Sequence, residues 1–221
     1  MSGIYFSICG FIFIIIFIIN FFSKRNTNNN ETKLYKSMLI ATFIGTGIDI
    51  FSYILYKIGW NINSLFYTLL SKMMLIYFIF WILTFLKYVY LISKKSIFKI
   101  KPLIFKILFI LFSTIILCTS ITFKETANAI IPTGLGVNMT YFIVAIGIVF
   151  IIVLTIENYK NIVVKKYTPI FLIIILLIIS FIIQRIFPDL FLINFCLTII
   201  VCVMYFTIEN PDMKMLEEVN K

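Results

Sequence analysis

The sequence predicts an all-α fold, an integral membrane bundle of seven transmembrane helices with the N-terminus outside and the C-terminus in the cytoplasm. The 221 residues are 62% hydrophobic and only 13% charged, with a mean hydropathy of +1.10. Soluble domains are nearer half apolar. Seven apolar stretches also have the length of about 20 residues that a helix needs to cross a bilayer. The basic residues between these stretches concentrate in every second loop.

The apolar stretches take up most of the chain, so one membrane domain accounts for its length. The first stretch is not a signal peptide, because Lys24 and Arg25 follow it instead of preceding it. In the second stretch, Ala41 and Gly45 form a small-xxx-small pair that allows close approach of another helix. Residues 123–137 are the longest predicted outer loop. The predicted spans are residues 3–22, 34–56, 65–92, 103–122, 138–156, 169–186 and 190–208.

The distribution of Lys and Arg residues predicts the orientation, because cytoplasmic loops carry an excess of them. The loops after the second, fourth and sixth spans hold only Lys57, Lys124 and Arg185. An odd number of spans then places the N-terminus outside and the C-terminus inside the plasma membrane. The net charge is +10, but no basic run resembles a nucleic-acid-binding patch. The predicted cytoplasmic residues are Lys24, Arg25, Lys33, Lys36, Lys94, Lys95, Lys99, Lys101, Lys160, Lys165 and Lys166.

The composition excludes several kinds of chemistry within these residues. The chain has no histidine, which excludes a histidine metal site, a histidine proton relay and a phosphoacceptor histidine. No phosphate-binding loop, metalloprotease motif or nucleophile-elbow motif is present. We therefore expect no catalytic residue, metal ligand or cofactor in this chain. The four cysteines lie in apolar spans and are expected to pack rather than to form disulfides; they are Cys9, Cys118, Cys196 and Cys202.

Asp49 and Lys72 are the first candidates for a binding site, since ionisable groups inside a bilayer are costly and commonly functional. The helical rise places both about 10 Å below the outer surface. An ion pair between them is therefore feasible, and it would line an outward-facing pocket for a polar or zwitterionic ligand. The alternatives are that the pair only neutralises its own charges, or that Lys72 extends to the surface.

Two further polar residues lie near the outer end of the sixth span. Gln184 and Arg185 are candidate ligand-binding residues on the same side of the membrane. The alternative for Arg185 is an interfacial anchor, paired with Asp189. Residues 132–136 in the outer loop are a candidate ligand-contact segment.

The last predicted span ends at a joint between two helices. Pro211 cannot continue a helix smoothly, while Asn210 is suited to cap a new helix and Asp212 to its first turn. A membrane domain is therefore predicted over residues 1–208, and the start of a cytoplasmic signalling helix over residues 209–221. We expect that helix to continue in a longer protein. The predicted signal-transmission hinge consists of Glu209, Asn210, Pro211 and Asp212.

The segment at this exit resembles part of a known family. Its residues 205–220 read Tyr-Phe-Thr-Ile-Glu-Asn-Pro-Asp-Met-Lys-Met-Leu-Glu-Glu-Val-Asn. This segment is similar to the one that joins the seven-span N-terminal sensor region of certain Firmicute-type membrane histidine kinases to their signalling helix. The resemblance implies a homodimer, an ATP-dependent kinase domain downstream and a response regulator as partner. The phosphoacceptor motif and the ATP-binding glycine boxes of a whole kinase are absent from these residues.

Two classes of function follow from these observations. In the first, the chain is the membrane input domain of a two-component histidine kinase and passes an extracellular or intramembrane stimulus through its last span. In the second, it is a small transporter or permease with Asp49 and Lys72 in the substrate path. A structural or assembly role in the membrane is a third possibility if neither residue matters.

Overall fold

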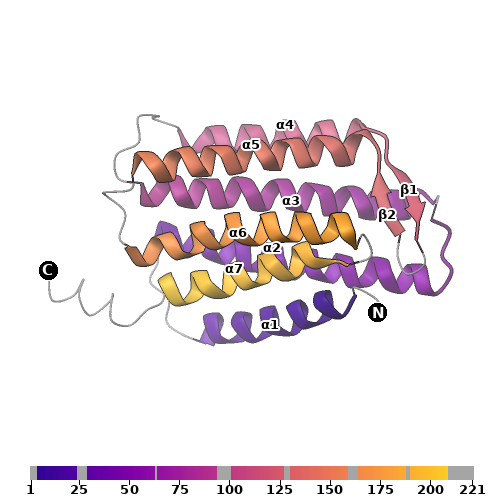
Figure 1. The fold of residues 1–221 in the computed structure, drawn as a ribbon, viewed down its shortest axis with the longest axis horizontal. Coiled ribbons are helices and arrows are strands. Elements are labelled where there is room, and N and C mark those ends of the chain that lie inside the picture. Colours follow the sequence, from indigo (N-terminus) through magenta and orange to yellow (C-terminus); the bar gives the residue numbers. More distant parts are fainter. Residues whose placement is uncertain are drawn as a thin grey trace, which may run out of the picture.

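In the part of the chain that the structure describes, seven helices lie side by side with their axes nearly parallel, and a small β-hairpin covers one end of the bundle (Figure 1). The computed structural model describes residues 4–23, 29–62, 64–93, 101–126, 130–158, 164–187 and 190–208. The helices are α1 (Ile4–Ser23), α2 (Asn30–Lys57), α3 (Leu65–Ile92), α4 (Pro102–Cys118), α5 (Leu135–Glu157), α6 (Val164–Ile186) and α7 (Leu192–Ile208). The predicted all-α class and the seven predicted helices are confirmed within these residues.

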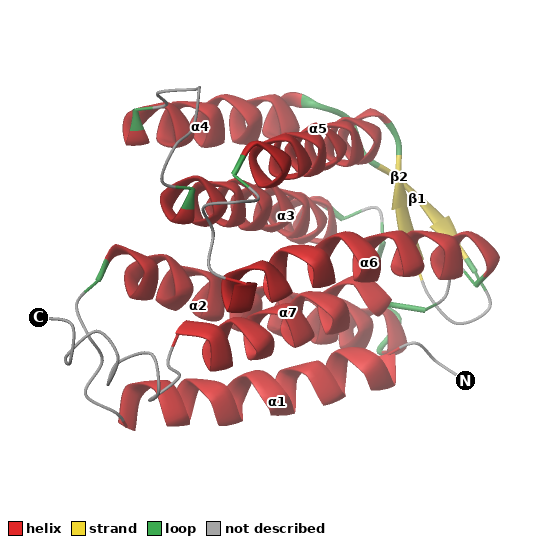
Figure 2. Ribbon diagram, turned by 60° about the vertical axis from the view of Figure 1, so that its left-hand side comes forward, coloured by secondary structure: helices red, strands yellow, loops and turns green. Residues whose placement is uncertain are grey.

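The helices form two groups that meet where α2 packs against α3. In one group α3 also packs against α4 and α5, and in the other α7 packs against α1, α2 and α6. Both views show this division, with α4 and α5 on one side of α3 and α1 and α7 on the far side of the bundle (Figure 2). Contacts between α5 and α6 are sparse. The two groups are therefore joined mainly through α2 and α3.

The outer surface of the bundle is apolar over much of its area. Large side chains such as Ile110, Phe142 and Phe206 are more than 60% exposed. Such a surface is costly in water and suits a lipid environment. The helices α1, α2, α3 and α5 are long and apolar enough to cross a membrane, and shorter apolar helices cover Pro102–Cys118, Pro169–Ser180 and Leu192–Thr207. The structure is thus compatible with a membrane protein.

Helix α3 forms the centre of the core. Trp81 is 2% exposed, stacks on Phe85 with ring centroids 5.4 Å apart, and donates its indole N–H to Thr42 Oγ1 of α2 over 3.1 Å. A buried indole N–H needs such a partner, since leaving it unpaired costs about 1–3 kcal/mol. At the start of α3, the Ser64 side chain accepts a hydrogen bond from the Tyr67 backbone N–H and caps the helix.

The fourth helix is shorter than the sequence prediction. The predicted span extended to residue 122, but α4 ends at Cys118, and its C-cap residue Thr119 is extended. Strand β1 (Thr122–Glu125) then pairs antiparallel with β2 (Ile130–Thr133). The β-branched residues that follow α4 favour extended backbone. Part of the predicted outer loop is therefore an ordered hairpin, which the apolar pattern alone did not indicate.

The predicted close approach at Gly45 is present. A Cβ atom built at Gly45 of α2 would overlap the ring of Tyr77 on α3. Tyr77 is itself only 6% exposed, so its ring has little room to move away. Glycine at this position therefore allows α2 and α3 to pack face to face, which is the contact that joins the two groups of helices.

We predict that Gly45→Ala lowers the free energy of unfolding by about 1–3 kcal/mol, the usual cost of overpacking a buried contact. Reversible unfolding in detergent micelles would measure it. Gly47→Ala is the matched control, because its Cβ would meet only Phe11 at an ordinary 3.7 Å. That variant should be as stable as the wild type or more stable, since alanine is the better helix former by about 1 kcal/mol. Equal destabilisation by both variants would contradict the packing role of Gly45.

Candidate functional site

Asp49 lies at a point where three helices meet. Its carboxylate oxygen Oδ2 accepts hydrogen bonds from Ser7 Oγ of α1 at 2.5 Å and from Asn194 Nδ2 of α7 at 3.0 Å. Ser7 is fully buried and Asn194 is 3% exposed, while Asp49 is half-buried on α2. Hydrogen bonds to a charged group are among the stronger ones. The carboxylate therefore links α1, α2 and α7.

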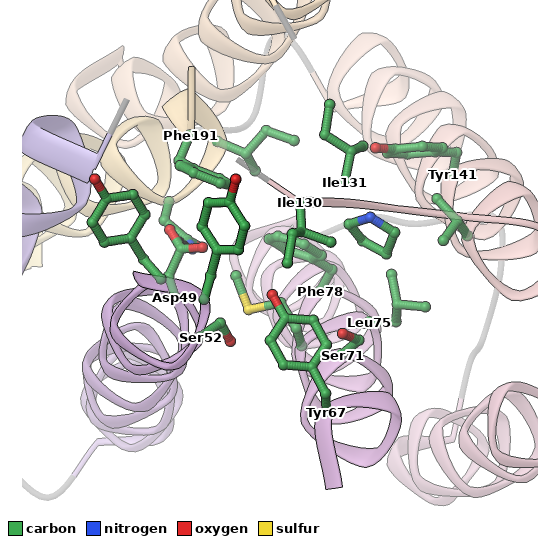
Figure 3. Close-up of a pocket in the computed structure, with 17 residues that line it drawn as sticks. Asp49, Ser52, Tyr67, Ser71, Leu75, Phe78, Ile130, Ile131, Tyr141 and Phe191 are labelled. Carbon is green, nitrogen blue, oxygen red and sulfur yellow. Dashed lines mark hydrogen bonds between the residues drawn. The ribbon is translucent and has the colours of Figure 1, made fainter. Parts of the chain in front are cut away.

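Asp49 also lines a cavity of about 140 Å³ near the hairpin end of the bundle. Its walls come from α2, α3, α5, α7, strand β2 and the residues just before α7. Asp49, Tyr67 and Ser71 point from their helices into a common space that Ile130 and Phe191 close from other sides (Figure 3). Its polar lining residues are Asp49, Ser52, Tyr53, Tyr56, Tyr67, Ser71, Tyr141 and Asn194.

Helical periodicity explains how α2 and α3 supply these side chains. On α2, Ser52, Tyr53 and Tyr56 follow Asp49 by three, four and seven positions, which places all four on one face. On α3, Ser71, Leu75 and Phe78 follow Tyr67 by four, eight and eleven positions, which also places them on one face. These side chains were missed in the sequence prediction, although a search for polar residues at helical spacing from Asp49 would have found those on α2.

The hairpin forms one wall of the cavity. Ile130, Ile131 and Pro132 of β2 line it, and the Phe123 ring of β1 packs edge-on against Tyr67 with centroids 5.2 Å apart. Ile130 and Tyr67 belong to a small buried apolar cluster under the hairpin. Pro132, from the segment proposed as a ligand-contact loop, is thus part of the cavity wall.

Lys72 is not part of this arrangement, and the predicted ion pair with Asp49 does not form. Lys72 Nζ donates to the backbone carbonyl of Leu117, 2.6 Å away, near the C-terminus of α4. The last carbonyls of a helix lack intrahelical donors and carry partial negative charge, so they are natural partners for an ammonium group. Lys72 is also absent from the cavity lining. The two ionisable residues therefore make different contacts, Asp49 with α1 and α7 and Lys72 with α4.

Some of the predicted residues fall outside the described parts of the chain. This holds for the side chains of Gln184 and Arg185 and for the whole predicted hinge, Glu209, Asn210, Pro211 and Asp212. Asn194 and Ser7, by contrast, were not predicted. Asn194 is a polar residue inside the last apolar stretch, and that property was the available signal in the sequence.

The side chains around Asp49 are suited to binding a ligand. A single carboxylate among neutral hydroxyl groups and an amide can hold a cation or a hydrogen-bond donor. Within the described residues no group of three or more potential metal ligands occurs, and the four cysteines are not joined by disulfides. No protein-family model matches this chain, and no curated protein matches it either.

We predict that double-mutant cycles separate the two candidate pairs. Asp49→Ala and Asn194→Ala should show a coupling free energy of about 0.5–3 kcal/mol in detergent unfolding, since these side chains share a hydrogen bond. Asp49→Ala and Lys72→Ala should be additive within about 0.5 kcal/mol, because they share no partner. Strong coupling between Asp49 and Lys72 would show that the charges interact after all.

Proposed function

We propose that this chain is the membrane input domain of a sensor, in which a stimulus at the Asp49 cavity is passed along α7 to the cytoplasm. The observation that carries the proposal is the hydrogen bond between Asn194 and Asp49. It connects the cavity to α7, which ends at Ile208 at the opposite end of the bundle (Figure 1). A ligand that competes for the Asp49 carboxylate would therefore act directly on α7.

The packing of α7 supports transmission over its whole length. The helical rise puts Ile208 about 21 Å from Asn194. Beyond Asn194, Ile200 and Met204 are fully buried, and the Tyr205 ring packs against Phe17 of α1 with centroids 5.3 Å apart. Closely packed interfaces respond to small displacements by switching between discrete arrangements. A rotation or shift of α7 would thus change its contacts near the membrane exit.

The proposed sensor has a defined orientation in the membrane and a kinase domain as its downstream partner. It places seven spans in the plasma membrane, the N-terminus outside, and the cavity toward the outer surface. The alternation of basic residues supports this orientation. The resemblance of residues 205–220 to histidine-kinase exit segments favours a homodimer that controls an ATP-dependent kinase domain and a response regulator, with the hinge at residues 209–212 as the connection.

Transport is the weaker of the two functions expected from the sequence. That hypothesis needs Asp49 and Lys72 in one substrate path, whereas only Asp49 lines the cavity. Lys72 is directed to the end of α4 by its bond to Leu117. We therefore do not propose a transport function. Uptake of a solute by vesicles that contain the protein would instead favour the transport function over the sensor function.

We predict that Asn194→Ala changes the signalling output. With the chain joined to the dimerisation and ATP-binding domains of a histidine kinase, basal autophosphorylation should shift about tenfold or more, because a hydrogen bond to a charged group contributes about 1.5–3 kcal/mol. Thr114→Val is the matched control, since Thr114 is exposed on α4 and bonds only within its own helix. Unchanged output in Asn194→Ala would overturn transmission through this contact.

The coding sequence after Lys221 provides an independent test of the kinase assignment. We expect a histidine followed by an acidic residue on a predicted helix soon after the exit, and an ATP-binding domain beyond it. Reading the gene downstream of the Lys221 codon would check this. A stop codon at that point would count against a kinase domain in the same polypeptide.

A further inference from the structure

A second, larger cavity lies beside the Asp49 cavity and forms an apolar groove. The groove has a volume of about 1010 Å³ and lies where α5 and α6 make few contacts. Phe78, Ile131, Tyr141 and Ile193 line both cavities, so the two are adjacent and share walls. Pockets of 300–1,000 Å³ commonly hold small organic ligands.

The groove has the shape and lining for a hydrocarbon chain. Along α5 it reaches from Thr140 to Ile148, a rise of about 12 Å. Trp81 lines it from α3, and Ile174 and Ile178 line it from α6. Apart from Lys124, Thr126, Thr140 and the hydroxyl of Tyr141, its lining is hydrophobic. An alkyl chain placed here would gain the contacts that α5 and α6 do not make with each other.

The smaller cavity contributes hydrogen-bond acceptors that need donors. Asn194 is 3% exposed, and its amide nitrogen Nδ2 donates to Asp49. The amide oxygen Oδ1 has no hydrogen-bond partner. Both hydrogen bonds of the Asp49 carboxylate reach Oδ2, which leaves Oδ1 available. A buried acceptor without a partner costs about 1–3 kcal/mol. A ligand group with several N–H donors and a positive charge would satisfy both residues.

We propose that the two adjacent cavities together bind a long-chain primary amine, a cationic amphiphile with its ammonium group at Asp49 and Asn194 and its alkyl chain in the groove. An ammonium group has three donors and the charge opposite to that of Asp49. Lys124 lines the hairpin side of the groove, and its like charge disfavours an ammonium group there. The two charged residues therefore direct the head toward Asp49 and the chain between α5 and α6.

The amine ligand rests on the proposed function, because it is the class of ligand that would act at the Asp49 cavity. The experiment that tests it measures binding alone. Failure to bind the amine leaves signalling through α7 untouched, and binding without a change in kinase output would overturn the sensor function instead. The protein offers its own reporter, because it has two tryptophans and Trp81 lines the groove. In Trp60→Phe, fluorescence arises from Trp81 only.

The experiment uses the full chain with Trp60→Phe, reconstituted in phosphatidylcholine vesicles, and dodecylamine brominated on its chain, since bromine quenches tryptophan on contact. We expect saturable quenching of Trp81 that unbrominated dodecylamine reverses. Dodecanol and dodecanoate should compete at least tenfold more weakly, because they lack the ammonium group. Asp49→Asn should weaken amine binding about tenfold or more, the effect of removing a charged hydrogen-bond partner.

A second variant tests the groove independently of the carboxylate. Ala145 is an exposed residue of α5 on the groove wall, so Ala145→Phe should fill the groove without disturbing the core and should weaken binding at least tenfold. Val149→Phe is the control, since Val149 is 58% exposed on the same helix and is not part of the lining. Equal quenching in the wild type, Asp49→Asn and Ala145→Phe would overturn the proposal and indicate partitioning into lipid only. Competition by dodecanoate as strong as by dodecylamine would overturn the assignment of a cationic head.

Discussion

The rest of the structure depends on how a carboxylate is accommodated inside an apolar bundle. A charged group in such surroundings is costly unless it is hydrogen-bonded. Ser7 and Asn194 supply the donors to Asp49, and they come from helices at opposite ends of the chain. These bonds hold α1, α2 and α7 together at one level of the bundle. The position of α7 is thereby linked to the hydrogen bonds of one side chain.

The placement of α7 has consequences for its neighbours. α6 packs along α7, whereas α5 packs along α3, and the two outer helices are left with few mutual contacts. The apolar groove between them follows from this division into two groups. The hairpin closes the end of the bundle at which the Asp49 cavity lies, and it contributes Ile130 and Pro132 to the wall of that cavity. A polar cavity and an apolar groove are thus products of one arrangement of helices.

The sequence was informative wherever a local pattern has a direct physical meaning. Apolar length predicted the helices, because a bilayer requires about 20 apolar residues in a row, and the predicted span over residues 65–92 coincides with α3. The spacing of Ala41 and Gly45 predicted a close helix approach, and Tyr77 provides it. The cost of burying charge indicated Asp49 as a candidate binding residue, and in the structure it lines a cavity. In contrast, the end of α4 was placed too late, since apolar content does not distinguish a helix end from a β-strand.

The sequence by itself determined the helical class and the number of apolar helices in the described residues, and it indicated Asp49 as a candidate, because these follow from composition and spacing along one chain. Only the tertiary structure decided the partners of Asp49. The expectation of a pair with Lys72 rested on similar depth in consecutive helices, but depth does not specify which face of a helix a side chain occupies. Packing directs Lys72 toward the free carbonyl of Leu117 and brings Asn194, 145 positions away in the sequence, to the carboxylate. Contacts between distant segments depend on the relative rotation of whole helices, which no local pattern encodes.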